Sequence, residues 1–276
     1  MQNKIEDILK QVRFLKPTSG AVIKVLNVLN DPNTDVEEIK NAILLDPALT
    51  ADVLRISNSA FFAFRQKITS IKHAVVLLGR KILKKIVFTV QMKGILNKKL
   101  KGYPQTEHTL WEHSLVAAVS AELIAEKLKY KNKELAYIGG LLHDIGKIIL
   151  DQYVKNAFEE ITKKLAEGMD LLNIEKEMFG YNHAEIGGII AENWQLPLPI
   201  KESIAFHHSP TEATQEVIIA LIVYLANNLA TFISPVGFHS TPQVESQLLN
   251  EIGLNEADLE EIMVNVIAKK EDILAF

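Results

Sequence analysis

Cysteine is absent from this 276-residue sequence, which excludes disulfide bonds, thiolate metal ligands and cysteine nucleophiles. Long hydrophobic runs are absent too: the longest, Val217–Ala226, is far shorter than the about 20 apolar residues of a membrane-spanning helix. The N-terminal residues MQNKIEDILKQVRFLK lack the apolar core of a secretory signal. The net charge is −4, so no overall positive charge favours nucleic acid or a membrane surface. We therefore expect a cytoplasmic protein with no membrane contact.

The hydrophobic pattern predicts helices along nearly the whole chain. Apolar residues recur at helical spacing, and no segment alternates apolar and polar residues as a strand does. Prolines fall at the ends of the apolar segments, and Asp46-Pro47 has the form of an N-cap followed by the first helical residue. We therefore predict an all-α fold. The predicted helices are 3–13, 19–30, 35–44, 47–57, 71–79, 80–97, 107–129, 133–150, 151–167, 170–179, 183–194, 198–208, 214–233, 241–251 and 256–273.

The helical pattern is interrupted most clearly at residues 100–106, where glycine, proline and polar residues combine. We interpret this segment as the joint between two lobes. The predicted N-terminal lobe comprises residues 1–103, and the second lobe comprises residues 104–276. Because the joint is short, we expect the two helical lobes to pack against each other.

Charge is unevenly distributed along the chain. Residues 65–101 contain eleven Lys or Arg and no Asp or Glu, whereas residues 240–276 contain eight carboxylates and two lysines. These segments could face each other, or Lys81, Lys84 and Lys85 could form a solvated helix face. The alternative is a basic surface for an acidic partner, a nucleotide or nucleic acid. We favour the solvated face and regard nucleic acid as a distant third candidate.

Three phenylalanines, Phe61, Phe62 and Phe64, follow a polar turn in the first lobe. They could form an exposed docking patch for another protein. The interpretation that we favour is that at least two of them fill the space between the lobes.

The stretch from Gly139 to Lys147 concentrates ionisable residues in an apolar segment. Apolar residues from Ile138 to Ile149 follow the spacing of a buried helical stripe. His143, Asp144 and Lys147 fall together on another face, because a helical turn takes about 3.6 residues. These side chains either reach water or share a compensating partner, and a divalent metal with a phosphate would be such a partner.

Histidines on other apolar segments favour the metal. An isolated histidine of this kind is more often a satisfied core residue than a ligand, but five of them with an aspartate and a lysine are hard to explain separately. Burying unpaired polar groups apart would cost about 1–3 kcal/mol each, and gathering them around cations removes that cost. The residues in question are His113, His143, His183, His207 and His208, with Asp144, Lys147 and the nearby Asn227.

The order of these residues resembles the HD superfamily of metal-dependent phosphohydrolases, and His143-Asp-Ile-Gly-Lys147 is similar to the form seen in HD-GYP phosphodiesterases. The first lobe resembles a narrower group, the HDOD (HD-related output domain) family. Three segments carry that resemblance: Asp46-Pro-Ala-Leu-Thr with Arg55, then Asn58-Ser-Ala-Phe61, then Ile68–Gly79. Together the resemblances cover about residues 14–230.

The HDOD resemblance implies an all-helical bacterial signalling module with a signalling protein partner, commonly with an eroded metal motif and without established catalysis. The superfamily pattern implies one metal held by His113, His143 and Asp144, with Asn227 or its neighbour where a late aspartate is usual. It implies a second metal held by Asp144, His183, His207 and His208. Asparagine offers a carbonyl oxygen without charge, so the first metal should be weakened. One or two divalent cations of iron, manganese or zinc would suit these ligands.

Two functions follow from the resemblance, and we favour the first. One is a regulatory module with a retained metal site. The other is a phosphohydrolase acting on a nucleotide or cyclic nucleotide, in which Asp144 and Lys147 would be catalytic. Against catalysis, the chain reads His207-His-Ser-Pro where a cyclic-dinucleotide phosphodiesterase would continue with Gly-Tyr-Pro, and Asn227 lacks the charge of the usual ligand.

Overall fold

The computed structural model of the chain describes residues 2–15, 24–25, 27–29, 31–59, 61–62, 66–103, 109–238 and 246–274. Within these ranges the regular elements are α-helices and one short 3₁₀ helix, and no residue lies in a β-strand. The predicted all-α fold is therefore confirmed for the described part of the chain. None of the described helices combines the length and apolarity that crossing a bilayer would require.

The chain divides into two compact units. One unit comprises Met1–Leu15 and Leu96–Ala268, and the other comprises Lys16–Ile95 and Lys269–Phe276. We call them the large unit and the small unit. The boundary predicted between residues 103 and 104 stays a prediction.

The small unit contains helices that begin and end at identifiable sequence signals. Asp46 caps α4, because its side chain accepts hydrogen bonds from the backbone N–H groups of Ala48 and Leu49 at 2.9 and 3.0 Å. Pro47 is the first helical residue, as predicted. The helices are α3 (Val36–Leu44), α4 (Pro47–Ser57), α5 (Ile71–Leu96, whose last residue belongs to the large unit) and α16 (Lys270–Leu274).

Helix α5 is interrupted at Gly79, whose φ of 71° and ψ of 170° are not helical. The interruption separates the two predicted helices 71–79 and 80–97. Asn58 fixes the chain before α5, because its amide group exchanges two 2.8 Å hydrogen bonds with the backbone of Ile68. The predicted helix 19–30 falls largely outside the described residues.

Phe61 and Phe62 pack edge to face in the small unit, with ring centroids 5.2 Å apart. Lys85 lies with Nζ 5.7 Å from the ring centroid of Phe61. Phe64 lies outside the described residues. The role predicted for the three phenylalanines stays a prediction.

The large unit is built around three helices most of whose residues are buried, α6, α7 and α13. Helix α6 is buried on nearly all sides, and it packs against α7 and α13. A Cβ on Gly140 would lie 2.8 Å from the carbonyl oxygen of Ala117, so glycine permits the close approach of α7 to α6. The helices of this unit are α1 (Gln2–Phe14), α6 (Leu110–Lys127), α7 (Lys133–Leu142), α8 (Gly146–Asn156), α9 (Phe158–Ala166), α10 (Leu171–Phe179), α11 (His183–Asn193), α12 (Leu198–Ala205), α13 (Val217–Ile233), α14 (Ser246–Glu251) and α15 (Glu256–Ala268).

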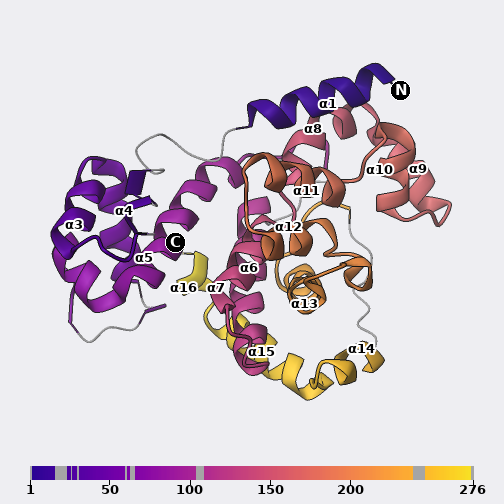
Figure 1. The fold of residues 1–276 in the computed structure, drawn as a ribbon. Coiled ribbons are helices and arrows are strands. Elements are labelled where there is room, and N and C mark those ends of the chain that lie inside the picture. The colour runs from indigo at the N-terminus through magenta and orange to yellow at the C-terminus, as the bar shows by residue number, and fades with distance from the viewer. Residues whose placement is uncertain are drawn as a thin grey trace. The chain divides into compact units, whose positions relative to one another are not determined.

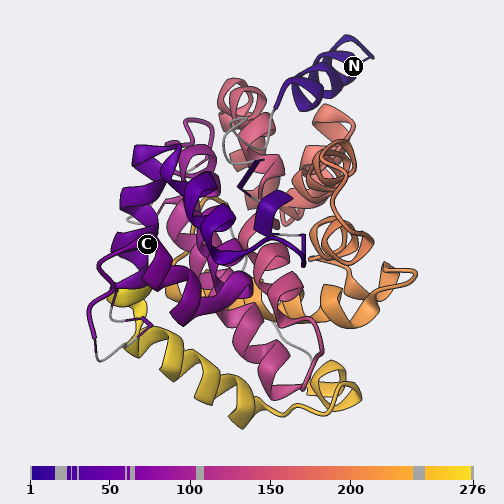
Figure 2. The same cartoon turned by 60° about the vertical axis from the view of Figure 1, so that its left-hand side comes forward.

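The remaining helices surround this core. Helix α11 packs against α8 and α12, and α1 lies along α8 and α11 (Figure 1). Helix α15 packs beside α6 (Figure 2). Lys127 at the end of α6 forms ion pairs with Asp258 and Glu261 of α15 at 2.9 and 2.8 Å. Part of the acidic C-terminal segment therefore meets a lysine within the same unit.

The predicted helix 133–150 is wrong in one respect that matters for the site. The chain forms two helices, α7 and α8, separated by the turn His143-Asp144-Ile145. The φ and ψ angles of His143 and Ile145 remain helical, but the hydrogen bonds tighten to the i to i+3 pattern, as from Lys147 N to Asp144 O at 3.0 Å. The predicted helix 151–167 is likewise divided, at Ala157.

Candidate metal centre

Six side chains from four segments of the large unit converge at the turn between α7 and α8. His143 and Asp144 lie in the turn itself, whereas His113 projects from α6 and His183 is the first residue of α11. His207 and His208 follow the end of α12. We call these six residues the histidine cluster. Lys147 on α8 and Asn227 on α13 lie beside it.

Local sequence signals place the cluster residues. Thr109 and Glu112 form a reciprocal capping box at the start of α6, one residue before His113. Asn182 and Glu185 form another at the start of α11, which fixes the backbone of His183. The turn can approach α11 closely because residue 146 is glycine: a Cβ there would lie 1.9 Å from the carbonyl oxygen of His183.

Asp144 lies at the centre of the cluster and is 1% exposed. Its Oδ2 faces one pair of histidines, with His143 Nε2 at 3.4 Å and His113 Nε2 at 3.6 Å. Its Oδ1 faces another pair, with His183 Nε2 at 3.4 Å and His207 Nε2 at 3.7 Å. The two oxygens of one carboxylate therefore face two separate groups of imidazoles.

Four of the histidines present Nε2 to the centre and use Nδ1 elsewhere. The Nδ1–H group of His143 donates to the carbonyl of Gly140, and that of His207 donates to the carbonyl of Ile204, both at 2.7 Å. The other two bonds run from His113 Nδ1 to the Ser234 carbonyl at 2.9 Å and from His183 Nδ1 to Glu175 Oε2 at 2.7 Å. These acceptors fix the tautomer, so Nε2 of each neutral ring carries a lone pair directed inward.

Burial and charge set the protonation of the cluster. Burial lowers the pKa of His113 to about 4, although the Asp144 carboxylate opposes the shift. Burial also lowers the pKa of His207 well below its usual value, and His208 adds to this effect. For Asp144 burial acts to raise the pKa, but Lys147 and His143 hold it well below its usual value. Neutral imidazole and ionised carboxylate are the forms that bind metals.

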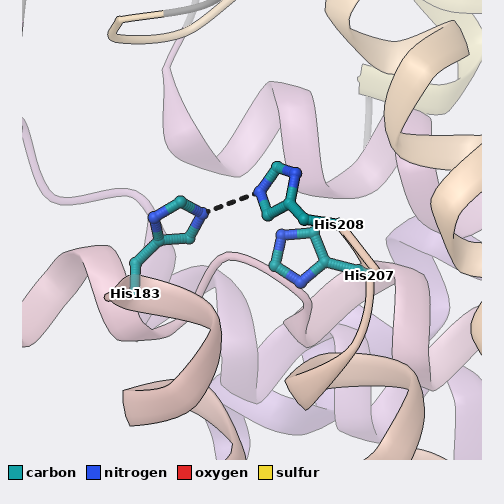
Figure 3. Close-up of side chains that lie close together, drawn as sticks. All are labelled: His183, His207 and His208. Atoms are coloured by element: carbon teal, nitrogen blue, oxygen red, sulfur yellow. Dashed lines mark hydrogen bonds between the residues drawn. The ribbon is translucent and has the colours of Figure 1, made fainter. Parts of the chain in front are cut away.

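Two buried polar atoms of the cluster have no hydrogen-bond partner within the described residues: Asp144 Oδ1 and His207 Nε2. Leaving such groups unsatisfied costs about 1–3 kcal/mol each, and a cation between them would satisfy both. The ligand atoms of His183, His207 and His208 lie within 4.8 Å of one another, and so do those of His113, His143 and Asp144. The rings of His183, His207 and His208 lie close together, with Nε2 of His183 and His208 3.0 Å apart (Figure 3). The donor set therefore fits a divalent transition metal.

The side near His113 differs from the side near His208. Lys147 Nζ lies 2.5 Å from Asp144 Oδ2, so an ammonium group already neutralises the oxygen that faces His113 and His143. Asn227 Oδ1 lies 3.2 Å from His113 Nε2 and brings no charge. A cation is therefore less favoured here than at Oδ1, which has no hydrogen-bond partner within the described residues.

A pocket of about 780 Å³ opens onto the cluster, and His113, His183 and His208 are part of its lining. His208 is the exposed member of the cluster. Polar side chains beside it come from α8 and α13: Lys147, Tyr224, Asn227, Asn228 and Thr231. Apolar lining residues come from α9, from α10, from the turn between them and from the residues after α13: Leu165, Met169, Leu171, Leu172, Val236 and Phe238. Asp170, the N-cap of α10, also lines the pocket.

Glu175 and the backbone acceptors of the cluster are absent from the residues predicted from the sequence. Glu175 lies on α10, is fully buried, and accepts hydrogen bonds from both the backbone N–H and the ring Nδ1–H of His183. One signal was available for the carbonyls: His143 and His207 each follow a helix end, and a histidine there can bond one of the last unpaired carbonyls of that helix. No signal in the sequence separates Glu175 from Glu177, the other acidic residue of α10.

The chain matches the sequence profile of the HDOD domain over residues 15–210. An HDOD domain protein with unknown function from Geobacter sulfurreducens has a solved structure that superposes with a TM-score of 0.77 at 26% identity. That match covers 98% of this chain and 99% of the Geobacter chain.

Two further proteins are similar to this chain. A candidate phosphohydrolase from Shewanella amazonensis SB2B superposes with a TM-score of 0.74 at 23% identity, covering 97% of this chain and 96% of its own, which establishes a shared fold. An uncharacterised protein of Treponema pallidum (strain Nichols) is 26% identical over 200 residues, which is 71% of this chain. The match spans only 38% of the length of that relative.

Proposed function

This chain belongs to the HDOD domain family, and from that membership and the geometry of the histidine cluster we propose that it is a signalling module that binds a divalent transition metal. The resemblance predicted from the motifs of residues 46–79 is thereby confirmed. The role of the module, its signalling protein partner and the metal site are our proposal.

We assign the tight metal position to Asp144 Oδ1 with His183, His207 and His208. The observation that carries this assignment is the pair of buried, unsatisfied atoms, Asp144 Oδ1 and His207 Nε2, that face the same space. Three imidazoles and one carboxylate suit zinc, manganese or iron. His113, His143 and Asn227 form the weaker position, because Lys147 already compensates Asp144 Oδ2.

The proposal is tested by the metal content of the purified chain. We expect close to one tightly held equivalent of zinc, manganese or iron by elemental analysis. The double variant His183→Ala, His207→Ala should lose it, because two of the four proposed ligands are removed. His73→Ala is the matched control, since His73 lies on α5 in the small unit. Equal metal content in the double variant and the control would refute the assignment.

A second candidate function is phosphoester hydrolysis, which the pocket favours. The pocket opens onto the cluster, and its lining combines polar groups of Lys147, Asn228 and Thr231 with apolar side chains from α9, from α10 and from the residues after α13. Such a lining suits an amphipathic anion, for example a nucleotide or cyclic nucleotide with its base on the apolar side. When bound, a divalent cation would polarise a phosphoryl oxygen and lower the pKa of water. Lys147 would stabilise the charge that develops on the phosphoryl group.

Hydrolysis of bis(4-nitrophenyl) phosphate by the zinc- or manganese-loaded chain distinguishes the two functions. Turnover that disappears in Asp144→Ala and persists in Asp258→Ala, a carboxylate on α15 paired with Lys127, would establish the enzyme. Metal binding without turnover of this ester would favour the regulatory module.

A further inference from the structure

Glu175 is a buried carboxylate that contacts His183, one of the proposed metal ligands, through the backbone N–H and the ring Nδ1–H group. Its Oε2 accepts from the backbone N–H of His183 at 2.9 Å and from the ring Nδ1–H at 2.7 Å. Its Oε1 accepts from the hydroxyl of Tyr103 at 3.1 Å. Both oxygens therefore accept hydrogen bonds from donors of two segments, and Glu175 is not among the residues that line the pocket.

Tyr103 is the last residue of the segment Leu96–Tyr103. This segment follows directly in sequence after Ile95 of the small unit and belongs to the large unit. The side chain of Tyr103 is fully buried, with its ring against Gly237. The preceding residue, Gly102, donates its N–H to Asp151 Oδ1 on α8 at 2.7 Å. A Cβ on Gly102 would lie 2.3 Å from the carbonyl oxygen of Asp151, so only glycine lets the segment lie this close to α8.

We propose that Glu175 and Tyr103 are positioning residues that hold His183 ready for the metal and link metal occupancy to the segment Leu96–Tyr103. The inference rests on the proposed metal site. It adds a relay, Tyr103 to Glu175 to His183, that joins this site to a connecting segment of the chain.

The hydrogen bonds of Glu175 explain why it would strengthen metal binding by His183. A carboxylate that accepts from Nδ1–H fixes the ring orientation, keeps Nε2 available and raises the basicity of the imidazole. The Tyr103 hydroxyl fixes the carboxylate in turn. Coupling of this kind is reciprocal: if the Tyr103 bond strengthens metal binding, then metal binding strengthens that bond by the same factor.

The test is a Zn²⁺ titration of the full-length chain by calorimetry, with the wild type, Glu175→Gln and Tyr103→Phe. We expect Glu175→Gln to weaken Zn²⁺ binding by about 10-fold or more, as loss of an outer partner usually does. Tyr103→Phe, one bond further away, should weaken it by about threefold. Tyr103→Phe keeps the buried aromatic ring and removes only the hydroxyl. It therefore still tests the proposal if Glu175→Gln fails to fold.

Tyr153→Phe is the matched control. The Tyr153 hydroxyl also donates to a carboxylate of the large unit, that of Asp7, and no described contact joins it to the histidine cluster. It should bind Zn²⁺ as the wild type does. A second readout is amide hydrogen exchange in residues 97–103, which Zn²⁺ should slow about threefold in the wild type and leave unchanged in Tyr103→Phe.

The outcomes separate this inference from the metal site itself. If the wild type binds Zn²⁺ while Tyr103→Phe and Glu175→Gln bind it equally well, the relay is refuted and the metal site stands. Equal weakening by Tyr103→Phe and Tyr153→Phe would also refute it, because the effect would then reflect general stability. A wild type that binds no Zn²⁺ overturns both proposals.

Discussion

Nε2 of His113 and Nε2 of His143 face each other at 3.3 Å, although each ring already donates its Nδ1–H to a backbone carbonyl. When both rings are neutral, two lone pairs therefore point at each other inside the protein. A shared cation or a proton on one ring would relieve this. Burial opposes the proton, and a metal supplies the cation without it.

The stability of the metal-free protein should fall in mild acid. In the unfolded chain His113 takes up a proton as the pH falls through about 6.5, but in the folded chain its pKa is lowered to about 4. Between these values the unfolded state binds more protons, so the contribution of His113 to the free energy of unfolding decreases as the pH falls toward 4 and is constant below it. The effect of His113 is on the order of 3 kcal/mol. Urea unfolding of chelator-treated protein at a series of pH values measures it.

His113→Gln is the variant that isolates this contribution, because glutamine cannot titrate. Its stability should depend less steeply on pH between 6.5 and 4 than that of the wild type. The lowered pKa of His207 acts in the same direction and should leave a residual slope. An unchanged slope in His113→Gln would contradict the assignment.

Asn227→Asp should create a second tight metal position. The amide oxygen of Asn227 already lies 3.2 Å from His113 Nε2, and a carboxylate there would add the negative charge that this side of the cluster lacks. In a calorimetric titration, the number of Mn²⁺ ions bound per chain should rise from about one in the wild type to about two in the variant. Asn228→Asp places the same charge on the adjacent residue, which lines the same pocket, and should leave the stoichiometry unchanged.

Several helix ends are determined by local sequence signals. The Asp46-Pro47 cap and the separation of the two helices at Gly79 were predictable, because each follows from the backbone preferences of one or two residues. The break at His143-Asp144-Ile145 was not. The apolar spacing continues through the turn and the φ and ψ angles stay helical, so only the hydrogen-bond pattern changes.

The proposed ligands of the candidate site were predictable from the sequence. The residues that hold those ligands in place, such as Glu175, were not. His113, His143, Asp144, His183 and the His207-His208 pair stand out because imidazoles are unusual on apolar helices. Glu175 does not stand out, because an acidic residue on the short helix α10 is ordinary. Its hydrogen-bond partners, the His183 N–H on α11 and the Tyr103 hydroxyl, lie on other segments of the chain and come together only in the tertiary fold.

Gly146→Ala should destabilise the protein and weaken metal binding together. The added Cβ would lie 1.9 Å from the carbonyl oxygen of His183, and backbone cannot move aside as a flexible side chain can. Overpacking of this kind costs about 1–3 kcal/mol and would push the turn away from α11. The matched change Gly94→Ala, on α5 with open space around it, should be stabilising by about 0.5–1 kcal/mol. Urea midpoints that move in the same direction for both variants would contradict this explanation.

Lys147→Met should make folding depend on metal. Lys147 Nζ lies 2.5 Å from Asp144 Oδ2, and without it the ionised carboxylate would be buried with no full positive charge beside it. Removing one partner of a buried pair costs about 3–5 kcal/mol. A divalent cation at Asp144 would replace the missing charge, so Zn²⁺ should raise the melting temperature of Lys147→Met more than that of the wild type.

Lys127→Met provides the comparison for that experiment, since Lys127 also pairs with carboxylates but on the surface of the same unit. An exposed pair contributes only about 0–1 kcal/mol, so this variant should melt close to the wild type and respond to Zn²⁺ in the same way. The two lysines differ in burial and in the carboxylates whose charge they neutralise. Lys147 is buried beside Asp144, whereas Lys127 pairs with Asp258 and Glu261. If Zn²⁺ stabilised both variants equally, Lys147 would have no special relation to the cation, and the placement of the metal at Asp144 would be wrong.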